Sequence, residues 1–399
     1  MNSQNKILML IPNMVGGGAE RVAARLMNEF HRIGYDVTFM LTSTERNGLV
    51  LRDLSDDIPL ILVREQIPGR ISLLCKIKRL FSSFFCRFFE MFDIAVPAFA
   101  AYLSFTSQYS QEIKYLRDYL MDNPDTAVIS FSQPANPLIM LAADGLDNKI
   151  IFSERADPVR LMKKRFGRKF IEKYYVRADA AVFQTEDAKR TYPENIAKKG
   201  VVIFNPITPG LPQPYDGERN KIITTFCRIS RQKNLPVLLD AFKDVHKRHS
   251  DFKLRIIGSP QNADDEFLFK EIKDKITHDG LTDAVIMEPF SKNVHFLILK
   301  DFMYVNSSDY EGMSNAMLEA MAIGLPCVCT DCPIGGANAV IKDGENGLLV
   351  PVGDPDTLAE AIERVISQPE LAFKLSQNAR KIREDLKLEN IAKQWMELV

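Results

Sequence analysis

The sequence predicts an α/β protein built from two doubly wound, Rossmann-like domains. Short continuous apolar runs alternate with segments of helical period, and this alternation stops at a Pro- and Gly-rich stretch before it restarts. The length of 399 residues fits two or three domains. Continuous apolar runs are typical of parallel strands buried on both faces, so each half should be a parallel sheet covered by helices.

Six predicted strands make up the first half of the chain. The strand at residues 7–11 leads into three glycines and a helix over residues 19–33, which Gly34 ends in the position favoured for a left-handed cap. The other five strands of this half are predicted at residues 37–41, 127–131, 150–152, 180–183 and 201–204. We assign residues 1–206 to an N-terminal domain.

A linker separates this half from a second series of strands and helices. Residues 205–220 contain four prolines and two glycines, a composition typical of a linker. The strands beyond it are predicted at residues 222–226, 254–257, 284–287, 302–305, 327–330 and 347–350. The helices between them are predicted at residues 235–248, 264–278, 314–323 and 355–367. We assign residues 214–384 to a C-terminal domain. Ligands bind off the carboxyl ends of such strands, so two facing sheets predict a cleft.

The composition excludes several classes of protein. Lys plus Arg total 51 and Asp plus Glu total 52, so the net charge is −1, which argues against a dedicated nucleic-acid binder. No uncharged apolar stretch reaches the length of about 18 residues that a simple transmembrane helix needs. Cys329 and Cys332 have C-x-x-C spacing but no second ligand pair nearby, so we expect free thiols in a reducing compartment. These features predict a cytoplasmic protein.

Two basic segments interrupt this neutral background, at residues 70–87 and 160–177. Leucines and phenylalanines recur at three- and four-residue steps over residues 70–89, with Lys and Arg mostly on the other sides. This pattern fits an amphipathic helix on an anionic membrane surface, and a core helix packed on the first sheet is the alternative. The second basic segment favours the membrane, so we expect peripheral association with the inner face of the cell membrane.

The glycines after the first strand form the first candidate binding loop. Gly17 and Gly18 precede a helix N-terminus, where backbone N–H groups can approach an anion. A dinucleotide-binding G-x-G-x-x-G fingerprint would need a third glycine at the position of Arg21, so a dehydrogenase is disfavoured. A tight turn without a ligand is the alternative.

A basic loop follows the first strand of the second half. Arg228 and Lys233 lie on this loop, at the carboxyl end of the strand at residues 222–226. Such a pair of cations suits a diphosphate whose negative charge grows as it leaves. A solvated basic loop is the alternative.

Two glutamates mark the third candidate loop. Glu311 lies just before the helix at residues 314–323, which Ser314 or Asn315 can cap, and Glu319 lies within the helix. Eight residues of helix separate two carboxylates by about 12 Å. Carboxylates this far apart cannot act on one bond as a glycosidase pair does. They can contact opposite ends of an elongated ligand whose phosphates lie at the helix N-terminus.

Four motifs, in this order, resemble the family 4 glycosyltransferases, which have the GT-B fold of two facing Rossmann-like domains. They are GGGAERV at residues 16–22, RISRQKN at 228–234, EGMSNAMLEAMAIGLPCV at 311–328 and KDGENGLLVPVGDPDTLAEAI at 342–362. The third contains the E-x7-E pair and is the most specific. The resemblance covers nearly the whole chain and extends to bacterial enzymes that make capsules, O-antigens, lipopolysaccharide and lipid-linked oligosaccharides.

The resemblance implies a retaining transfer of a sugar from a nucleotide diphosphate donor, for which we expect a UDP-sugar. The acceptor would be a glycan or a lipid-diphosphate-linked glycan on the N-terminal domain, and no metal or other cofactor would be needed. Arg228, Lys233 and Glu311 would be catalytic. The donor-binding residues would be Gly17, Gly18, Gly258, Phe290, Gly312, Met313, Ser314, Asn315 and Glu319. Glu319 would bind the ribose, Gly258 and Phe290 would bracket the base, and residues 385–399 would return to the N-terminal domain.

One departure from the family concerns the acceptor side. Many relatives place a His after the fourth or fifth strand of the first domain, and Arg155 stands there in this chain. Glu154 and Arg155 are therefore the candidate acceptor-side residues, and none of the five histidines is expected in a cleft loop of that domain. A sugar-nucleotide epimerase on the same fold and a non-catalytic nucleotide-sugar-binding subunit are the alternative functions.

Overall fold

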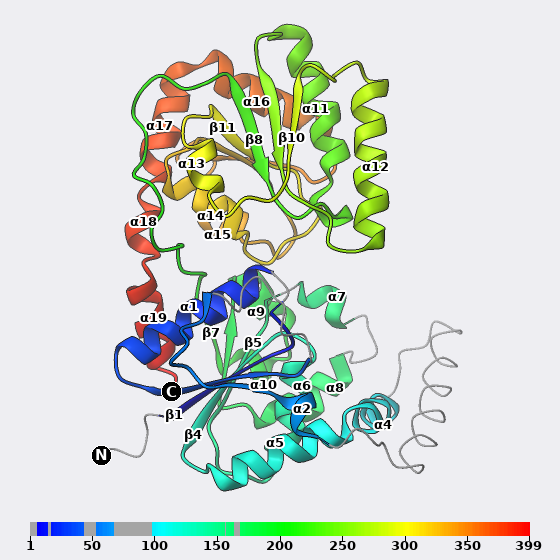
Figure 1. Cartoon of the computed structure of the whole chain (residues 1–399), viewed down its shortest axis with the longest axis vertical. Helices are drawn as coiled ribbons and strands as arrows, with labels where there is room; N and C mark the ends of the chain where they lie inside the picture. The colour runs from blue at the N-terminus through cyan, green and yellow to red at the C-terminus, as the bar shows by residue number, and fades with distance from the viewer. Residues whose placement is uncertain (1–5, 15–16, 44–52, 68–97, 156, 163–167) are drawn as a thin grey trace. The chain divides into compact units, whose positions relative to one another are not determined.

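The chain forms two compact units in the computed structural model (Figure 1). The N-terminal unit contains Met1–Asn205 and Leu388–Val399, and the C-terminal unit contains Pro206–Lys387. The residues that the structure describes are 6–14, 17–43, 53–67, 98–155, 157–162 and 168–399. The predicted amphipathic segment at residues 70–89 lies outside the described residues, as do residues 163–167 of the second basic segment.

A seven-stranded parallel sheet forms the centre of the N-terminal unit. The strand order is β3-β2-β1-β4-β5-β6-β7, and every pairing is parallel. The strands are β1 (Lys6–Ile11), β2 (Asp36–Leu41), β3 (Leu60–Leu62), β4 (Thr126–Phe131), β5 (Ile150–Ser153), β6 (Ala180–Phe183) and β7 (Gly200–Val202). The residues of β4, β5 and β6 are all buried, which explains their continuous apolar sequences.

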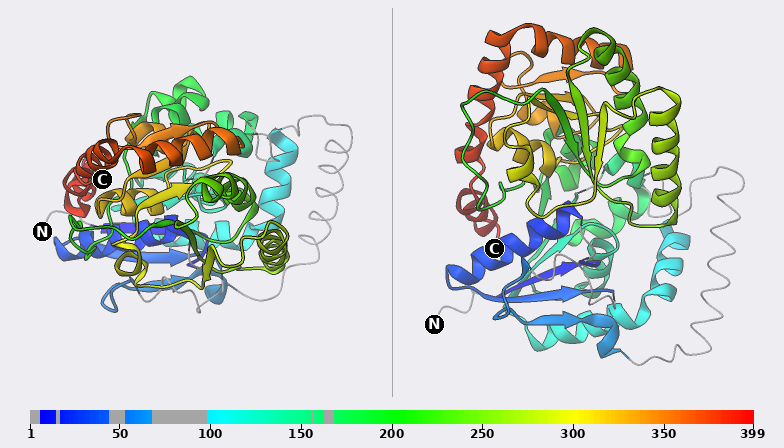
Figure 2. Two further views of the ribbon diagram at one scale, coloured as in Figure 1. Left: turned by 90° about the horizontal axis from the view of Figure 1, so that it is seen from above. Right: turned by 45° about the horizontal axis from the view of Figure 1, so that its top comes forward.

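Helices cover both faces of this sheet. They are α1 (Gly18–Arg32), α2 (Val63–Gln66), α4 (Ala98–Gln108), α5 (Ser110–Asp122), α6 (Ala135–Ala142), α7 (Pro158–Met162), α8 (Arg168–Tyr174), α9 (Glu186–Thr191), α10 (Glu194–Ala197) and α19 (Leu388–Met396), with the 3₁₀ turn η2 (Tyr175–Arg177). Helix α1 lies on one side of the sheet and α5 on the other (Figure 1). Helix α19 packs beside α1, as both views of Figure 2 show, and buries Trp395 against the ring of Phe131.

The C-terminal unit has a six-stranded parallel sheet with the order β10-β9-β8-β11-β12-β13. The strands are β8 (Ile222–Phe226), β9 (Lys253–Ile257), β10 (Val285–Glu288), β11 (Met303–Asn306), β12 (Cys327–Thr330) and β13 (Leu348–Val350). The helices are α11 (Leu235–Arg248), α12 (Ala263–His278), α13 (Val294–Ile298), α14 (Asn315–Ala322), α15 (Ala337–Val340), α16 (Pro355–Ser367), α17 (Pro369–Ala379) and α18 (Ile382–Asp385), with the 3₁₀ turn η3 (Arg231–Lys233).

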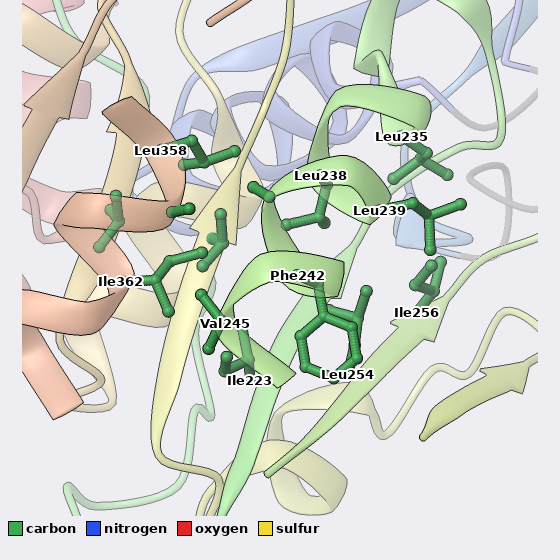
Figure 3. Close-up of a cluster of buried hydrophobic side chains, with 14 of the residues drawn as sticks. Ile223, Leu235, Leu238, Leu239, Phe242, Val245, Leu254, Ile256, Leu358 and Ile362 are labelled. Atoms are coloured by element: carbon green, nitrogen blue, oxygen red, sulfur yellow. The ribbon is translucent and has the colours of Figure 1, made fainter. Parts of the chain in front are cut away.

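The hydrophobic core of this unit lies between its sheet and the helices α11 and α16. Figure 3 shows Leu238 and Phe242 of α11 among Ile223 of β8, Leu254 of β9 and Ile362 of α16. Because α11 presents its apolar side chains to this core, the start of the helix is held close to the carboxyl end of β8. The basic loop that joins β8 to α11 is thereby fixed at the edge of the sheet where ligands bind in this class of fold.

The twelve predicted strands are all present, with bounds within two residues of those expected, and β3 is an additional edge strand. The α/β class with two doubly wound sheets is therefore confirmed. None of the described helices is long and apolar enough to cross a bilayer.

Candidate functional site

The candidate donor residues of the C-terminal unit gather at one edge of its sheet. Arg228 follows β8, Gly258 follows β9, Phe290 follows β10 and Glu311 follows β11. All four strands are parallel and adjacent, so these four loops leave the same edge. The sheet thus brings together residues that are far apart in the sequence.

An ion pair connects two of these loops. Lys233 Nζ pairs with Glu311 Oε1, and their side chains are 18% and 13% exposed. Ser308 Oγ donates to the same oxygen at 2.7 Å, and Gln232 Nε2 donates to Oε2 at 3.3 Å. Burial opposes the charge on Lys233, but the Glu311 carboxylate outweighs it and raises the pKa of Lys233 above its usual value. The lysine is therefore held as a cation and the glutamate is held in place.

Further hydrogen bonds connect the two loops rigidly to each other. Lys233 ends η3, and Asn234 follows in the left-handed region with φ 41°. Asn234 Nδ2 donates to Asp309 Oδ1 at 2.6 Å, and the Asp309 backbone N–H donates to the Gln232 carbonyl at 2.9 Å. Ser307 Oγ donates to the Lys233 carbonyl at 2.9 Å. These bonds fix the basic loop against the loop of Glu311.

Arg228 differs from Lys233 in having no side-chain partner among the residues that the structure describes. Its side chain is exposed, and it forms no hydrogen bond or ion pair with any residue that the structure describes. Its positive charge is close enough to Lys233 to oppose the raised pKa of that lysine. Arg228 is therefore exposed to an incoming anion, beside a lysine whose positive charge is held in place by Glu311.

The N-terminus of α14 lies directly after Glu311 in the chain. Ser314 is the N-cap, and its Oγ accepts from the Met317 N–H at 3.3 Å. Gly336, in the loop after β12, packs closely against the turn that precedes α14. A Cβ at Gly336 would lie 2.8 Å from Met313 Cα and 2.9 Å from the Gly312 carbonyl oxygen. The close approach fixes the backbone that leads into the helix. Backbone N–H groups in such a turn suit an anionic ligand.

Glu319 is buried on α14 with both carboxylate oxygens engaged. Thr208 Oγ1 donates to Oε1, and His295 Nε2 lies 2.9 Å from Oε2. Glu319 is 5% exposed and His295 is 9% exposed. The sequence does not reveal the His295 contact, because α13 and α14 are separate elements and no spacing rule connects them.

Gly258 and Phe290 lie at the ends of β9 and β10. The Gly258 N–H donates to the Glu288 carbonyl at 2.9 Å, and a Cβ at Gly258 would clash with the Cys227 carbonyl oxygen. The Phe290 N–H donates to Ser259 Oγ at 3.0 Å, and its ring is 43% exposed. Glycine is thus required by the close approach of two loops, and Phe290 offers an exposed ring beside them.

In the N-terminal unit, the glycine loop leads into α1. Gly17 is the N-cap of α1 and Gly18 is the first residue of the helix. The Glu20 side chain folds back over Gly17, and its carboxylate lies where a side chain at position 17 would place its Cβ. Gly16 lies outside the described residues.

The candidate acceptor-side residues are packed into their own unit. The Arg155 guanidinium lies 4.2 Å over the Phe131 ring and 5.3 Å over the Trp395 ring, and Nη1 donates to Asn205 Oδ1 at 2.8 Å. Burial lowers the pKa of Arg155 to about 9, although the Glu154 carboxylate opposes this. Glu154 is itself buried and accepts from the hydroxyl of Tyr192 at 3.1 Å. In this structure Arg155 fixes α19 to the end of β4.

Within the described residues, no group of three or more His, Cys, Asp or Glu side chains could hold a metal ion. The four described cysteines are unpaired.

The sequence is similar to known glycosyltransferases. Residues 213–382 match the sequence model of the family described as "Glycosyl transferases group 1". An uncharacterized glycosyltransferase of Haemophilus influenzae is 24% identical over 382 residues, which are 95% of each chain. An alpha-1,4-N-acetyl-D-galactosaminyltransferase of Campylobacter jejuni, whose name includes a PP-undecaprenol-linked glycan, is 25% identical over 291 residues, or 71% of this chain and 77% of the relative.

The fold is also that of solved glycosyltransferase structures. The structure of HepE from Anabaena in complex with UDP aligns with a TM-score of 0.75 over 98% of each chain, at 17% identity. The two parallel α/β units therefore define a GT-B protein. The sequence matches support a glycosyltransferase of the group 1, family 4 type, with the group 1 model matched over residues 213–382. Three of the four motifs that suggested this family, at residues 228–234, 311–328 and 342–362, lie within the matched residues.

Proposed function

We propose that this glycosyltransferase is a retaining, metal-independent enzyme that moves a sugar from a UDP-sugar to a glycan or lipid-diphosphate-linked acceptor in cell-surface polysaccharide synthesis. The observation that supports this most directly is the arrangement of Arg228, Lys233, Glu311 and the α14 N-terminus at one edge of the sheet. Cations and helix N–H groups suit a diphosphate, and the carboxylate suits sugar hydroxyls.

In the proposed donor complex, the diphosphate contacts Arg228 and the turn formed by Gly312, Met313, Ser314 and Asn315. Negative charge grows on the diphosphate as the bond to the sugar breaks. Cations in fixed positions stabilise that charge more in the transition state than in the ground state, which raises turnover. Lys233, held by Glu311, supplies the second positive charge without a metal ion.

The proposed reaction needs no covalent enzyme intermediate. The acceptor hydroxyl attacks the anomeric carbon from the face on which the diphosphate leaves, and a phosphate oxygen of the leaving group takes the hydroxyl proton. The protein contributes orientation and charge stabilisation. Glu311 would bind the donor sugar, Glu319 would bind the ribose, and Gly258 and Phe290 would bracket the base. Gly17 and Gly18 would face the diphosphate or the acceptor.

The proposal of a membrane-linked acceptor has two supports. The Campylobacter relative is named for a PP-undecaprenol-linked glycan. In this chain, α4 exposes the apolar side chains of Phe99 and Leu103, and α8, which packs against α4, exposes the basic side chains of Lys169 and Lys173. An apolar surface beside a basic one suits an anionic bilayer interface, so we propose a peripheral enzyme on the inner face of the cell membrane.

A panel of nucleotide sugars tests this function. Each donor is incubated with and without lipid-diphosphate acceptors, and released nucleoside diphosphate is measured. We expect release from a UDP-sugar that rises strongly when acceptor is added, and a product whose anomeric configuration, read by NMR, equals that of the donor. An inverted product would overturn the retaining mechanism. Epimerised donor without transfer, or binding without any turnover, would favour the epimerase or the non-catalytic subunit instead.

A further inference from the structure

The carboxylate of Glu319 is held from two sides. Thr208, at the start of the C-terminal unit, donates its hydroxyl to Oε1, and His295 Nε2 of α13 lies 2.9 Å from Oε2. Glu319 and His295 are both buried. A buried carboxylate has lost much of its hydration, and hydrogen bonds from fixed donors replace it. The orientation of Glu319 therefore depends on these two neighbours.

The His295 ring is itself fixed by aromatic packing. Phe226, the last residue of β8, meets it edge to face with ring centroids 5.7 Å apart and an interplanar angle of 88°. Phe226 in turn packs on Tyr304 of β11, with centroids 5.3 Å apart. The imidazole is thus supported by the two central strands of the sheet. This support directs Nε2 toward Glu319.

The chemistry of imidazole makes this contact directional. A neutral imidazole has one N–H, and a bond to a carboxylate requires that the proton is on Nε2. His295 therefore serves as a donor to Glu319 in the neutral Nε2–H form as well as in the charged form. A carboxylate oxygen can accept more than one hydrogen bond, so the same carboxylate can bind a vicinal diol while His295 holds it.

We propose that His295 is a positioning residue of the donor site, which holds the Glu319 carboxylate in the orientation that binds the two ribose hydroxyls of the nucleoside diphosphate. Thr208 fixes the other oxygen in the same way. This inference rests on the proposed function, because it assigns the ribose to Glu319. His295 does not touch the donor and acts through Glu319.

The first test compares three variants by calorimetric titration with UDP. His295→Phe keeps a ring against Phe226 but removes the donor, and we expect UDP affinity to fall about tenfold, the equivalent of about 1.4 kcal/mol. His295→Gln restores an N–H donor and should return the affinity close to that of wild type. His278→Phe, at an exposed histidine of the same unit, is the matched control and should change nothing. At saturating donor, turnover of His295→Phe should stay close to the wild-type value while KM rises.

The second test separates positioning from a merely structural role. Wild type should bind UDP more tightly than 2′-deoxy-UDP, and His295→Phe and Thr208→Val should each narrow that preference. In a Glu319→Ala background, His295→Phe should have no further effect on UDP affinity. A lower Tm with unchanged affinity and unchanged preference for UDP would overturn the inference.

The same titrations distinguish failure of the inference from failure of the proposed function. If Glu319→Ala weakens UDP binding and neither His295→Phe nor Thr208→Val does, the ribose assignment stands and His295 is not a positioning residue. If wild type binds UDP and 2′-deoxy-UDP equally, the ribose assignment and the inference are both wrong, although UDP remains a ligand. If wild type does not bind UDP, the proposed donor is wrong.

Discussion

Lys233 and Glu311 form an ion pair that joins the loop after β8 to the loop after β11. The nearby Arg228 has no partner among the described residues. Lys233 is held by this ion pair, whereas the Arg228 side chain is exposed and, in the proposed site, would bind the diphosphate. Substitutions at the two positions should separate these roles.

Arg228→Ala should reduce function and leave stability unchanged. A hydrogen bond to a charged group contributes about 1.5–3 kcal/mol, so we expect kcat/KM to fall about 10- to 100-fold. Because the Arg228 side chain is exposed and has no partner in the part of the chain that the structure describes, Tm should not move. Initial rates and thermal unfolding measure the two effects. Arg231→Ala, in the same loop and paired with Glu271 at the surface, is the control. Equal activity of the two variants would place the diphosphate elsewhere.

Lys233→Ala should reduce both function and stability. Removing Lys233 leaves the largely buried Glu311 carboxylate without a partner for its charge. Because the pair is not fully buried, the free energy of unfolding should fall by about 1–3 kcal/mol. Urea unfolding measures the loss. The double variant Lys233→Ala/Glu311→Gln should regain part of this stability, because no uncompensated charge is left, but its activity should stay below that of wild type. A double variant that is less stable than the single one would contradict the pairing argument.

The elements of the fold were predictable from sequence where burial is complete. Strands such as β4 and β12 are buried on both faces, so their apolar runs identify them. Strand β3 was not predicted, because it has three residues at the edge of the sheet. Helix α6 gives no helical period in the sequence, because its residues are buried nearly all round and it lacks a polar face.

The candidate site was predictable where its residues follow strands or begin helices. Arg228 and Glu311 could be placed in this way, because parallel strands bring their loops to one edge. The environments of His295 and Arg155 could not, because each depends on packing between distant parts of the chain. His295 meets Glu319 from another helix, and Arg155 meets Trp395 from the C-terminal helix. No spacing in the sequence encodes either contact.

Gly258→Ala should damage the donor site through the backbone. The added Cβ would clash with the Cys227 carbonyl oxygen, which cannot move without shifting the loop of Arg228. Overpacking of this kind costs about 1–3 kcal/mol, and UDP affinity should fall with it. Gly344→Ala is the control. Its φ of +70° strains the backbone of any residue with a side chain, but a Cβ at this position would have no neighbouring atom within 4 Å. It should lower Tm and leave UDP affinity intact. Unchanged UDP affinity in Gly258→Ala would show that this loop is not part of the donor site.

Excess chelator should not change the transfer rate. The proposed mechanism neutralises the leaving diphosphate with Arg228, Lys233 and the α14 N-terminus, so it requires no divalent ion. The rate is measured with a UDP-sugar and acceptor after dialysis against EDTA. Loss of activity that Mg²⁺ or Mn²⁺ restores would show that a metal ion does the neutralising.

Flotation with liposomes tests the membrane proposal. The exposed apolar side chains of Phe99 and Leu103 on α4 lie in the unit that also exposes basic residues on α8. Burial of apolar area and attraction to anionic headgroups should act together, so binding should rise with the fraction of anionic lipid and fall with salt. Phe99→Ser/Leu103→Ser should reduce the bound fraction.

The matched control for this flotation is Phe267→Ser/Phe373→Ser, which removes two phenylalanines that are 60% and 65% exposed on the C-terminal unit. It should float like wild type, because the proposed surface belongs to the N-terminal unit. A wild-type protein that stays unbound on anionic liposomes at low salt would refute peripheral attachment and favour a soluble acceptor. Equal losses in both double variants would show that exposed apolar area in general, and not the surface of α4 and α8, causes the binding.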